Sequence, residues 1–359
     1  MSITLNQHRE HITKMIIASF SDDAAVKGGL SAFFPATTTI EKMVGIEVER
    51  NRQLIAVDVQ RNTDPNHNKF STSAEKLFVP PFYNESWDFT SAQRYDVTFG
   101  ARTNPSSPDA LNMLNEATRR LSTLKAKIMR AIELQRAQAL QTGIVQLVNG
   151  DNIDYKRKAA SVGSVLAAGN WTASTGKPLD DIATGCDFLR EEGLSASGTV
   201  SMILGKDAFS AFMNNDQVKE KADFRRISRL EIGMPQFNDL TGLVFHGQIG
   251  TADYTVNIWT YNEFYELDNG TKTRYIDVDN MILIPEDFKA VTAHAGIPAI
   301  MRDKGNAEYP EWITPIEAEF YINNYVDPRK KAHWFEIASA PLAIPISIDR
   351  VYTLGVLTT

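Results

Sequence analysis

The stretch that decides the fold lies late in the chain, where residues 311–345 read EWITPIEAEFYINNYVDPRKKAHWFEIASAPLAIP. Its apolar residues come in short runs that are typical of strands. Proline cannot donate a hydrogen bond within a sheet ladder, so it belongs at strand ends and sheet edges. The pattern therefore predicts edge strands that return late in the chain. The prolines that mark these boundaries include Pro310, just before the stretch, and Pro328, Pro341 and Pro345 within it.

The composition is that of a folded protein, with 43% hydrophobic and 23% charged residues. A chain of 359 residues is too long for one typical core, so we expect two lobes. The net charge of −7 argues against wholesale nucleic-acid binding by charge neutralisation. Cys186 is the single cysteine, which excludes an intramolecular disulfide and predicts a small buried hydrophobic side chain. We expect neither a membrane span nor a signal peptide.

Residues 108–142 form the clearest predicted element, a long amphipathic helix. Ser107 is a favourable N-cap, Pro108 suits the first helical position and Gly143 is expected just past the end. Such a helix would span roughly 50 Å, so we interpret it as a structural strut. Its apolar stripe comprises Leu111, Leu114, Leu121, Leu124, Ile128 and Ile132. Its other side is basic and comprises Arg119, Arg120, Lys125, Lys127, Arg130 and Arg136.

Two extended stretches precede this helix. Residues 46–59 and 77–99 alternate between apolar and other side chains, and a polar tip at residues 61–69 joins them. The pattern predicts a projecting two-stranded finger. Because such a ribbon is only marginally stable in water, a neighbouring subunit is its natural support.

The middle of the chain mixes helices and strands and predicts an α+β lobe. We expect a hairpin over residues 144–156, and strands 254–267 and 271–284 joined as a second hairpin by Asp268-Asn269-Gly270. A connector rich in small residues over 161–178 leads into this lobe. Helices are predicted over 5–20, 180–193 and 206–221, and a buried strand over 199–204.

Motifs that would carry catalysis or bind a cofactor are not evident. Gly205-Lys206 resembles the end of a phosphate-binding loop, but that pattern needs Gly at Val200 and Ser or Thr at Asp207. We therefore interpret Gly205 as a strand-to-helix turn and expect no cofactor. His8 and His11 lack accompanying metal ligands, so we expect no metal site. A hydrolase remains an alternative, because catalytic triads are recognised by geometry.

The order and spacing of several segments resemble the phage major capsid protein E family of lambda-type tailed phages. The resemblance covers roughly residues 30–345, and no single motif decides it. The segments are 178–182, the strand–helix unit 196–209, 218–221 with Arg225-Arg226, the 261–279 hairpin, Tyr309-Pro310 and 339–342.

The resemblance implies an α+β fold of the Hong Kong 97 type. By this mapping, residues 1–44 are an N-terminal arm and 45–97 an extended loop. Residues 98–180 and 308–345 are a peripheral domain with 108–142 as its spine helix. Residues 181–307 are an axial domain, and 346–359 a C-terminal tail.

The resemblance further implies a major capsid protein that self-assembles into hexamers and pentamers of an icosahedral bacteriophage head around double-stranded DNA. Expected partners are further copies of the chain, a portal protein, a separate scaffolding protein and a decoration protein, with no sequence-specific DNA contact and no membrane. Assembly is expected in the host cytoplasm and the final location is the virion. An encapsulin-like cellular compartment is the first alternative, and a hydrolase the second.

We expect Tyr309 to Leu342 to hold copies of the chain together. The basic side of the long helix either meets packaged DNA or pairs with acidic side chains of adjacent subunits, and the acidic net charge favours pairing or simple solvation. A Lys–Asn cross-link, from Lys69 or Lys76 to Asn323 or Asn324, is a further alternative. The candidate inter-subunit contact residues are Arg61, Lys69, Lys76, Trp87, Arg119, Arg130, Tyr309, Trp312, Asp327 and Arg329.

Overall fold

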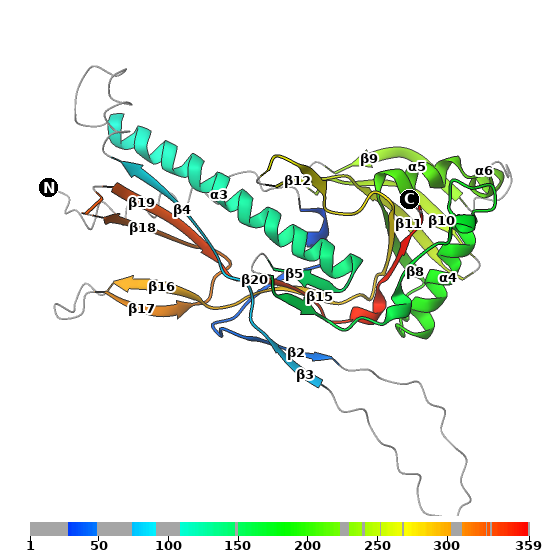
Figure 1. Ribbon diagram of the computed structural model, residues 1–359, viewed down its shortest axis with the longest axis horizontal. Coiled ribbons are helices and arrows are strands. Elements are labelled where there is room, and N and C mark those ends of the chain that lie inside the picture. The colour runs from blue at the N-terminus through cyan, green and yellow to red at the C-terminus, as the bar shows by residue number, and fades with distance from the viewer. Residues whose placement is uncertain are drawn as a thin grey trace, which may run out of the picture.

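A long helix organises the molecule (Figure 1). The structure, a computed structural model, describes residues 28–48, 74–90, 108–147, 150–222, 230–238, 241–251, 253–267, 269–302, 311–327, 329–330 and 332–357. Helix α3 (Pro108–Gln141) runs diagonally across the body, as the periodicity predicted. It ends at Gln141, and the chain turns away at Gly143, whose φ of 71° suits glycine and whose N–H donates to the Ala139 carbonyl at 3.2 Å.

The first lobe is α3 packed on a three-stranded antiparallel sheet in the order β18–β19–β4. The predicted apolar stripe makes this contact, since Leu121, Ile128 and Ile132 are buried against Phe335 and Ile337 of β19. The strands are β4 (Tyr83–Thr90), β18 (Tyr321–Asp327) and β19 (Ala332–Ser339). Of the late return strands in this sheet, β18 lies at an edge, as the proline pattern predicted, whereas β19 lies at the centre between β18 and β4, because a pattern of apolar runs does not show how many neighbours a strand has.

The finger includes fewer residues of its second arm than predicted. Strand β2 (Val44–Val48) pairs antiparallel with β3 (Ala74–Phe78), and this ribbon projects from the body (Figure 1). Residues 83–90, expected in an arm of the finger, instead form β4 and pair with β19 along their whole length. The expectation was wrong because alternation identifies a strand without identifying its partner. Residues 49–73, including the polar tip, lie outside the described residues, as does the helix predicted over 5–20.

The second lobe is built on a mixed seven-stranded sheet in the order β7–β21–β14–β8–β11–β10–β9. Helices α4 (Pro178–Glu191), α5 (Lys206–Asn214) and α6 (Asp216–Ala222) cover one face. Cys186 is buried there as a free thiol, and burial raises its pKa to about 12. The strands are β7 (Val162–Ser164), β8 (Thr199–Leu204), β9 (Leu230–Phe237), β10 (Leu243–Gly250), β11 (Thr255–Tyr261), β14 (Asn280–Pro285) and β21 (Tyr352–Gly355).

Three predictions for this lobe need correction. The hairpin at Gly270 pairs only the short strands β12 (Phe264–Glu266) and β13 (Lys272–Arg274), because β8 lies between β11 and β14. The helix predicted over 206–221 is interrupted at Asn215, whose backbone is extended. The expected tail 346–359 contains β21, which pairs with both β14 and β7.

A continuous core joins the two lobes. The C-terminal half of α3 packs on the second face of the large sheet and on a small sheet of β1 (Ala36–Thr38), β15 (Ala290–His294) and β20 (Pro341–Pro345). Leu30 and Phe34, in and just after the turn η1 (Gly29–Ala32), are fully buried in it. The predicted hairpin over 144–156 is confirmed as β5 (Ile144–Gln146) and β6 (Asn152–Asp154).

The remaining elements are short. A second ribbon, β16 (Ile297–Arg302) with β17 (Glu311–Ile316), projects beside the first lobe (Figure 1). Single turns occur at η2 (Ala159–Ser161), η3 (Ala167–Gly169) and η4 (Ile348–Arg350). The 161–178 connector belongs to the second lobe, since it supplies β7 and the fully buried Trp171.

Candidate assembly surfaces

The outer side of α3 carries the basic residues that the sequence singled out. Arg119, Lys127 and Arg130 are exposed along it, and Lys127 pairs with Glu85 of β4 at 2.8 Å. Arg136, counted from the sequence among the basic side, is instead buried. It follows Ile132 by one helical turn and so lies on the buried face of α3, where its guanidinium donates to Thr292 of β15.

Buried polar side chains of α3 fasten the two lobes together. The Glu133 side chain is 1% exposed and accepts hydrogen bonds from the Leu30 N–H and the Tyr261 hydroxyl, both at 2.8 Å. Arg136 pairs with Glu133 at 3.1 Å and donates to Thr292 of β15. Burial and the neighbouring Glu133 charge raise the pKa of Tyr261, so its hydroxyl remains a donor. Sequence reasoning missed this network, because the helical pattern does not show that both sides of α3 are covered.

The end of α3 is held equally firmly. Gln141 donates to the Tyr275 carbonyl at 2.9 Å and accepts from the Asp277 N–H at 2.9 Å. The Arg157 guanidinium donates to the carbonyls of Leu140 and Val351 at 2.6 and 2.7 Å. Burial lowers the pKa of Arg157 to about 9. The spine helix and the second lobe therefore form one stiff unit.

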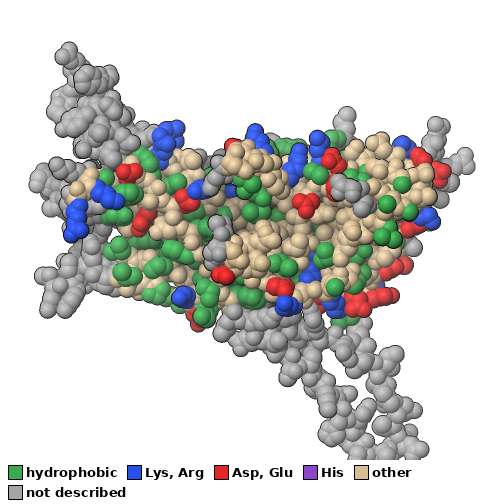
Figure 2. Space-filling model, viewed as in Figure 1, with side chains coloured by type: hydrophobic (Ala, Val, Ile, Leu, Met, Phe, Trp, Pro, Cys, Tyr) green, Lys and Arg blue, Asp and Glu red, His purple; other side chains and the backbone are tan. Residues whose placement is uncertain are grey.

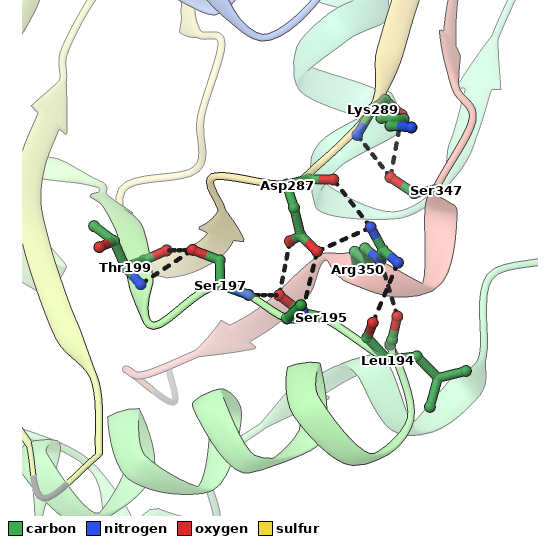
Figure 3. A network of polar contacts seen from close by, with 10 residues as sticks. Leu194, Ser195, Ser197, Thr199, Asp287, Lys289, Ser347 and Arg350 are labelled. Carbon is green, nitrogen blue, oxygen red and sulfur yellow. Dashed lines mark hydrogen bonds and ion pairs between the residues drawn. The ribbon is translucent and has the colours of Figure 1, made fainter. Parts of the chain in front are cut away.

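A polar clasp ties the segment after β20 to the turn that follows α4 (Figure 3). Arg350 pairs with Asp287 at 3.0 Å and donates to the Leu194 carbonyl at 3.2 Å. Leu194 has a φ of 52°, which is uncommon for a residue with a side chain. The Asp287 carboxylate also accepts from the Ser195 hydroxyl at 2.7 Å. Each group of the clasp binds another part of the same chain, so its role is structural.

Trp87 is half-buried and packs within its own subunit. Its ring stacks on Phe335 with centroids 5.7 Å apart, and the Arg120 guanidinium lies 5.9 Å from the ring centre. These contacts hold β4 beneath α3. Only the outer part of this half-buried side chain is left to meet another copy.

The other predicted contact residues are scattered. Arg329 is exposed near the end of the first lobe. Lys76, Trp312 and Asp327 lie in β3, β17 and β18, and their side chains are not described. Asn323 is buried and donates to Glu336 at 2.8 Å, and Asn324 is also buried. Arg61, Lys69 and Tyr309 lie outside the described residues.

Apolar side chains that sequence reasoning did not single out are exposed on the β16–β17 ribbon and next to the β2–β3 ribbon. Ile313 of β17 is 76% exposed and faces Ile300 of β16, which is 38% exposed. A second set lies at the base of the finger, just before β2 and just after β3. These residues are Ile40, Met43, Val79 and Phe82. Exposed apolar groups of this kind mark interaction surfaces.

Gly205 has a packing role. A Cβ at this position would lie 2.2 Å from the Asp277 carbonyl oxygen, so glycine lets the β8–α5 turn approach another loop. Within the described ranges, no three His, Cys, Asp or Glu side chains gather as a metal site would need. No helix among those residues combines the length and hydropathy required to cross a bilayer.

Comparison with known proteins gives a family and a fold. A family model described as Phage major capsid protein E matches residues 29–356. The chain resembles the putative capsid protein of a prophage of E. coli CFT073, with TM-score 0.59, 16% identity and 99% of each chain covered. It also resembles a phage-related protein from Bordetella bronchiseptica RB50, with TM-score 0.52, 10% identity and 96% of each chain covered. Cyanophage A-1(L) capsid gives TM-score 0.50 and 10% identity over 94% of this chain and 95% of that one. No curated protein matches the sequence.

Proposed function

Since the chain belongs to the phage major capsid protein E family and has the Hong Kong 97-type capsid fold, we propose that it builds the pentameric and hexameric rings of an icosahedral phage head around double-stranded DNA. The single observation that carries this proposal is the family match, which spans residues 29–356. The same match favours a phage head over the encapsulin-like compartment and over the hydrolase.

The shape of the subunit supports assembly. Two ribbons, β2–β3 and β16–β17, extend away from the packed lobes (Figure 1). An isolated two-stranded ribbon is at best marginally stable in water, so each gains from lying on another copy. The exposed Ile300–Ile313 pair and the apolar base of the finger give such a contact hydrophobic area.

We assign the parts of the subunit to shell roles on this basis. Residues 1–44 are the arm, and the finger is the extended loop, which we now end near residue 82 because β4 pairs with β19. The first lobe, with α3 as its spine, is the peripheral domain. The second lobe is the axial domain around the ring axes, and it includes β21.

Other components complete the proposed particle. We propose a separate scaffolding protein during assembly in the host cytoplasm, a portal protein at one vertex and a decoration protein on the outside. DNA contacts are independent of sequence, and the net charge of −7 fits packaging that does not depend on tight binding by the shell. The protein then resides in the virion.

Electron microscopy of the purified full-length chain tests the proposal, with and without co-expressed scaffolding protein from the same genome. Closed shells or five- and six-membered rings are expected. A small species of uniform size that never assembles under either condition would contradict it. Shells that co-purify with an enzyme cargo and carry no DNA in infected cells would instead favour the cellular compartment.

A further inference from the structure

We infer that the outer face of the β16–β17 ribbon binds the same face of a copy in an adjacent ring. This outer face is defined by four residues, Pro298, Ile300, Ile313 and Pro315. The inference rests on the proposed function, because it requires rings that meet one another. It adds which surface joins ring to ring, and it identifies the partner of that surface as a second copy of itself.

The ribbon is apolar on both faces. Successive residues of a strand point to opposite sides, so a ribbon with one solvated face normally alternates apolar and polar residues. Neither strand alternates in this way, because residues 297–301 read IPAIM and residues 312–316 read WITPI. Such nearly continuous apolar runs are typical of strands that are covered on both sides.

The subunit covers only one of these faces. Ile297 and Ala299 are fully buried, and Ile297 shares a cluster with Ala338 of β19. The residues of the outer face alternate with these two and oppose each other across the ribbon, proline to proline and isoleucine to isoleucine. All four are exposed, and Ile313 is 76% exposed. An uncovered apolar surface of this kind marks an interaction site.

The ribbon lies at the end of the subunit that is far from the second lobe (Figure 1). In Figure 2, hydrophobic side chains gather in the same region, at the lower left, with few charged side chains among them. Because the second lobe is assigned to the ring axis, this end forms the outer margin of the ring. One ring meets the next at that margin, so the ribbon is placed to join them.

The chemistry of the margin selects the partner. Another exposed surface at this end is the outer side of α3, which is basic through Arg119, Lys127 and Arg130. Covering those charges with isoleucine and proline would take them out of water, which is unfavourable. A second outer face offers apolar side chains instead, so both faces gain by leaving water together. A contact between identical faces is isologous and relates two copies by a twofold rotation.

An apolar contact also suits the geometry of a shell. A shell contains both five- and six-membered rings, so the angle between neighbouring rings varies with position. Hydrogen bonds depend steeply on direction, whereas hydrophobic burial is non-directional. Two outer faces can therefore tilt relative to each other and remain in contact.

Charge substitutions at the most exposed residue test the contact. Ile313→Lys and Ile313→Glu each place like charges opposite one another when an outer face meets itself. Both variants should fold and form rings but lose closed shells by about tenfold or more. Ile300→Lys and Ile300→Glu repeat the test across the ribbon. Leu166→Lys is the matched control, because Leu166 is 84% exposed and lies in the second lobe, and it should form shells as the wild type does. Electron microscopy and sedimentation count rings and shells, and circular dichroism reports folding.

Mixing rings of the two Ile313 variants identifies the partner. A Lys face should bind a Glu face, so the mixture should form ring-to-ring contacts that neither variant forms alone. Normal shells from either variant would overturn the inference, since the outer face would then join no copies. Loss of rings together with shells would place the face inside the ring, and a mixture without ring-to-ring contacts would show that it meets a different surface. Either result also overturns the inference, whereas a wild-type chain that forms no rings contradicts the proposed function.

Discussion

The Tyr261 hydroxyl of β11 donates to the Glu133 carboxylate of α3 at 2.8 Å, within a region that excludes solvent. This bond crosses from the second lobe to the spine helix. Because Glu133 also holds the Leu30 N–H and Arg136, one carboxylate fixes three separate parts of the subunit. A shell built from such subunits would deform at contacts between copies before it deformed within one copy.

Replacing Tyr261 by Phe should lower the free energy of unfolding by about 1.5–3 kcal/mol, because a hydrogen bond to a charged group is lost. Glu133→Ala should cost more, about 3–5 kcal/mol, since it leaves Arg136 buried without its partner. Urea unfolding of the unassembled subunit measures both. If both substitutions lower the unfolding free energy by the same small amount, Glu133 does not hold α3 to the second lobe.

Gly29→Ala should destabilise the subunit by about 1–3 kcal/mol through overpacking. A Cβ there would lie 2.7 Å from the Tyr261 ring and 2.9 Å from the Thr241 carbonyl oxygen. Gly198→Ala is the matched control, because a Cβ at that glycine meets nothing within 4 Å. Thermal unfolding compares the two. A similar melting temperature for both variants would contradict the close packing of residues 29–34 described above.

Acidification should weaken the fold partly through His294. Burial lowers the pKa of this side chain below its ordinary 6.5, with Arg136 also lowering it and Glu319 opposing. The unfolded chain therefore binds a proton that the folded chain resists, so stability falls as pH drops below about 6.5.

The loss of unfolding free energy between about pH 7 and about pH 5 should be smaller in His294→Gln than in the wild type. His246, whose pKa is also lowered by burial, contributes separately and stays in place in both proteins. If the unfolding free energies of the two proteins change by the same amount between these pH values, His294 does not contribute to the acid sensitivity.

Deleting residues 61–69 should leave the subunit folded but impair shell assembly. The sequence of that stretch is polar, as a loop tip requires, and a finger gains support from a neighbouring copy. Circular dichroism reports the fold and electron microscopy the shells. A shorter deletion, of the three-residue turn at 268–270, provides a comparison. Normal shells from the 61–69 deletion would show that the finger is dispensable.

Local patterns predicted the elements that local forces determine. Helix α3 follows from its apolar periodicity with Pro108 at its start and Gly143 after its end, and β8 from a short apolar run. Pairings between distant strands could not be obtained in this way. Alternation in residues 83–90 is equally compatible with the finger and with β19, and only the packing of α3 against Phe335 and Trp87 selects the second.

The candidate surfaces were predicted unevenly for the same reason. The basic residues of α3 were evident from spacing, and Arg119 and Arg130 are indeed exposed. Arg136 has the same chemistry, yet it is interior because it follows Ile132 by one turn and so lies on the face of α3 that packs inward.

The position of β21 has a consequence for synthesis. Residues 352–355 lie between β14 and β7, so strands made much earlier stay incompletely paired until this late segment is available. A ribosome-bound chain would carry an unfinished second lobe with open strand edges, which favour aggregation. Folding of that lobe, and with it the capacity to join a ring, is thereby postponed until nearly the whole matched sequence has been translated.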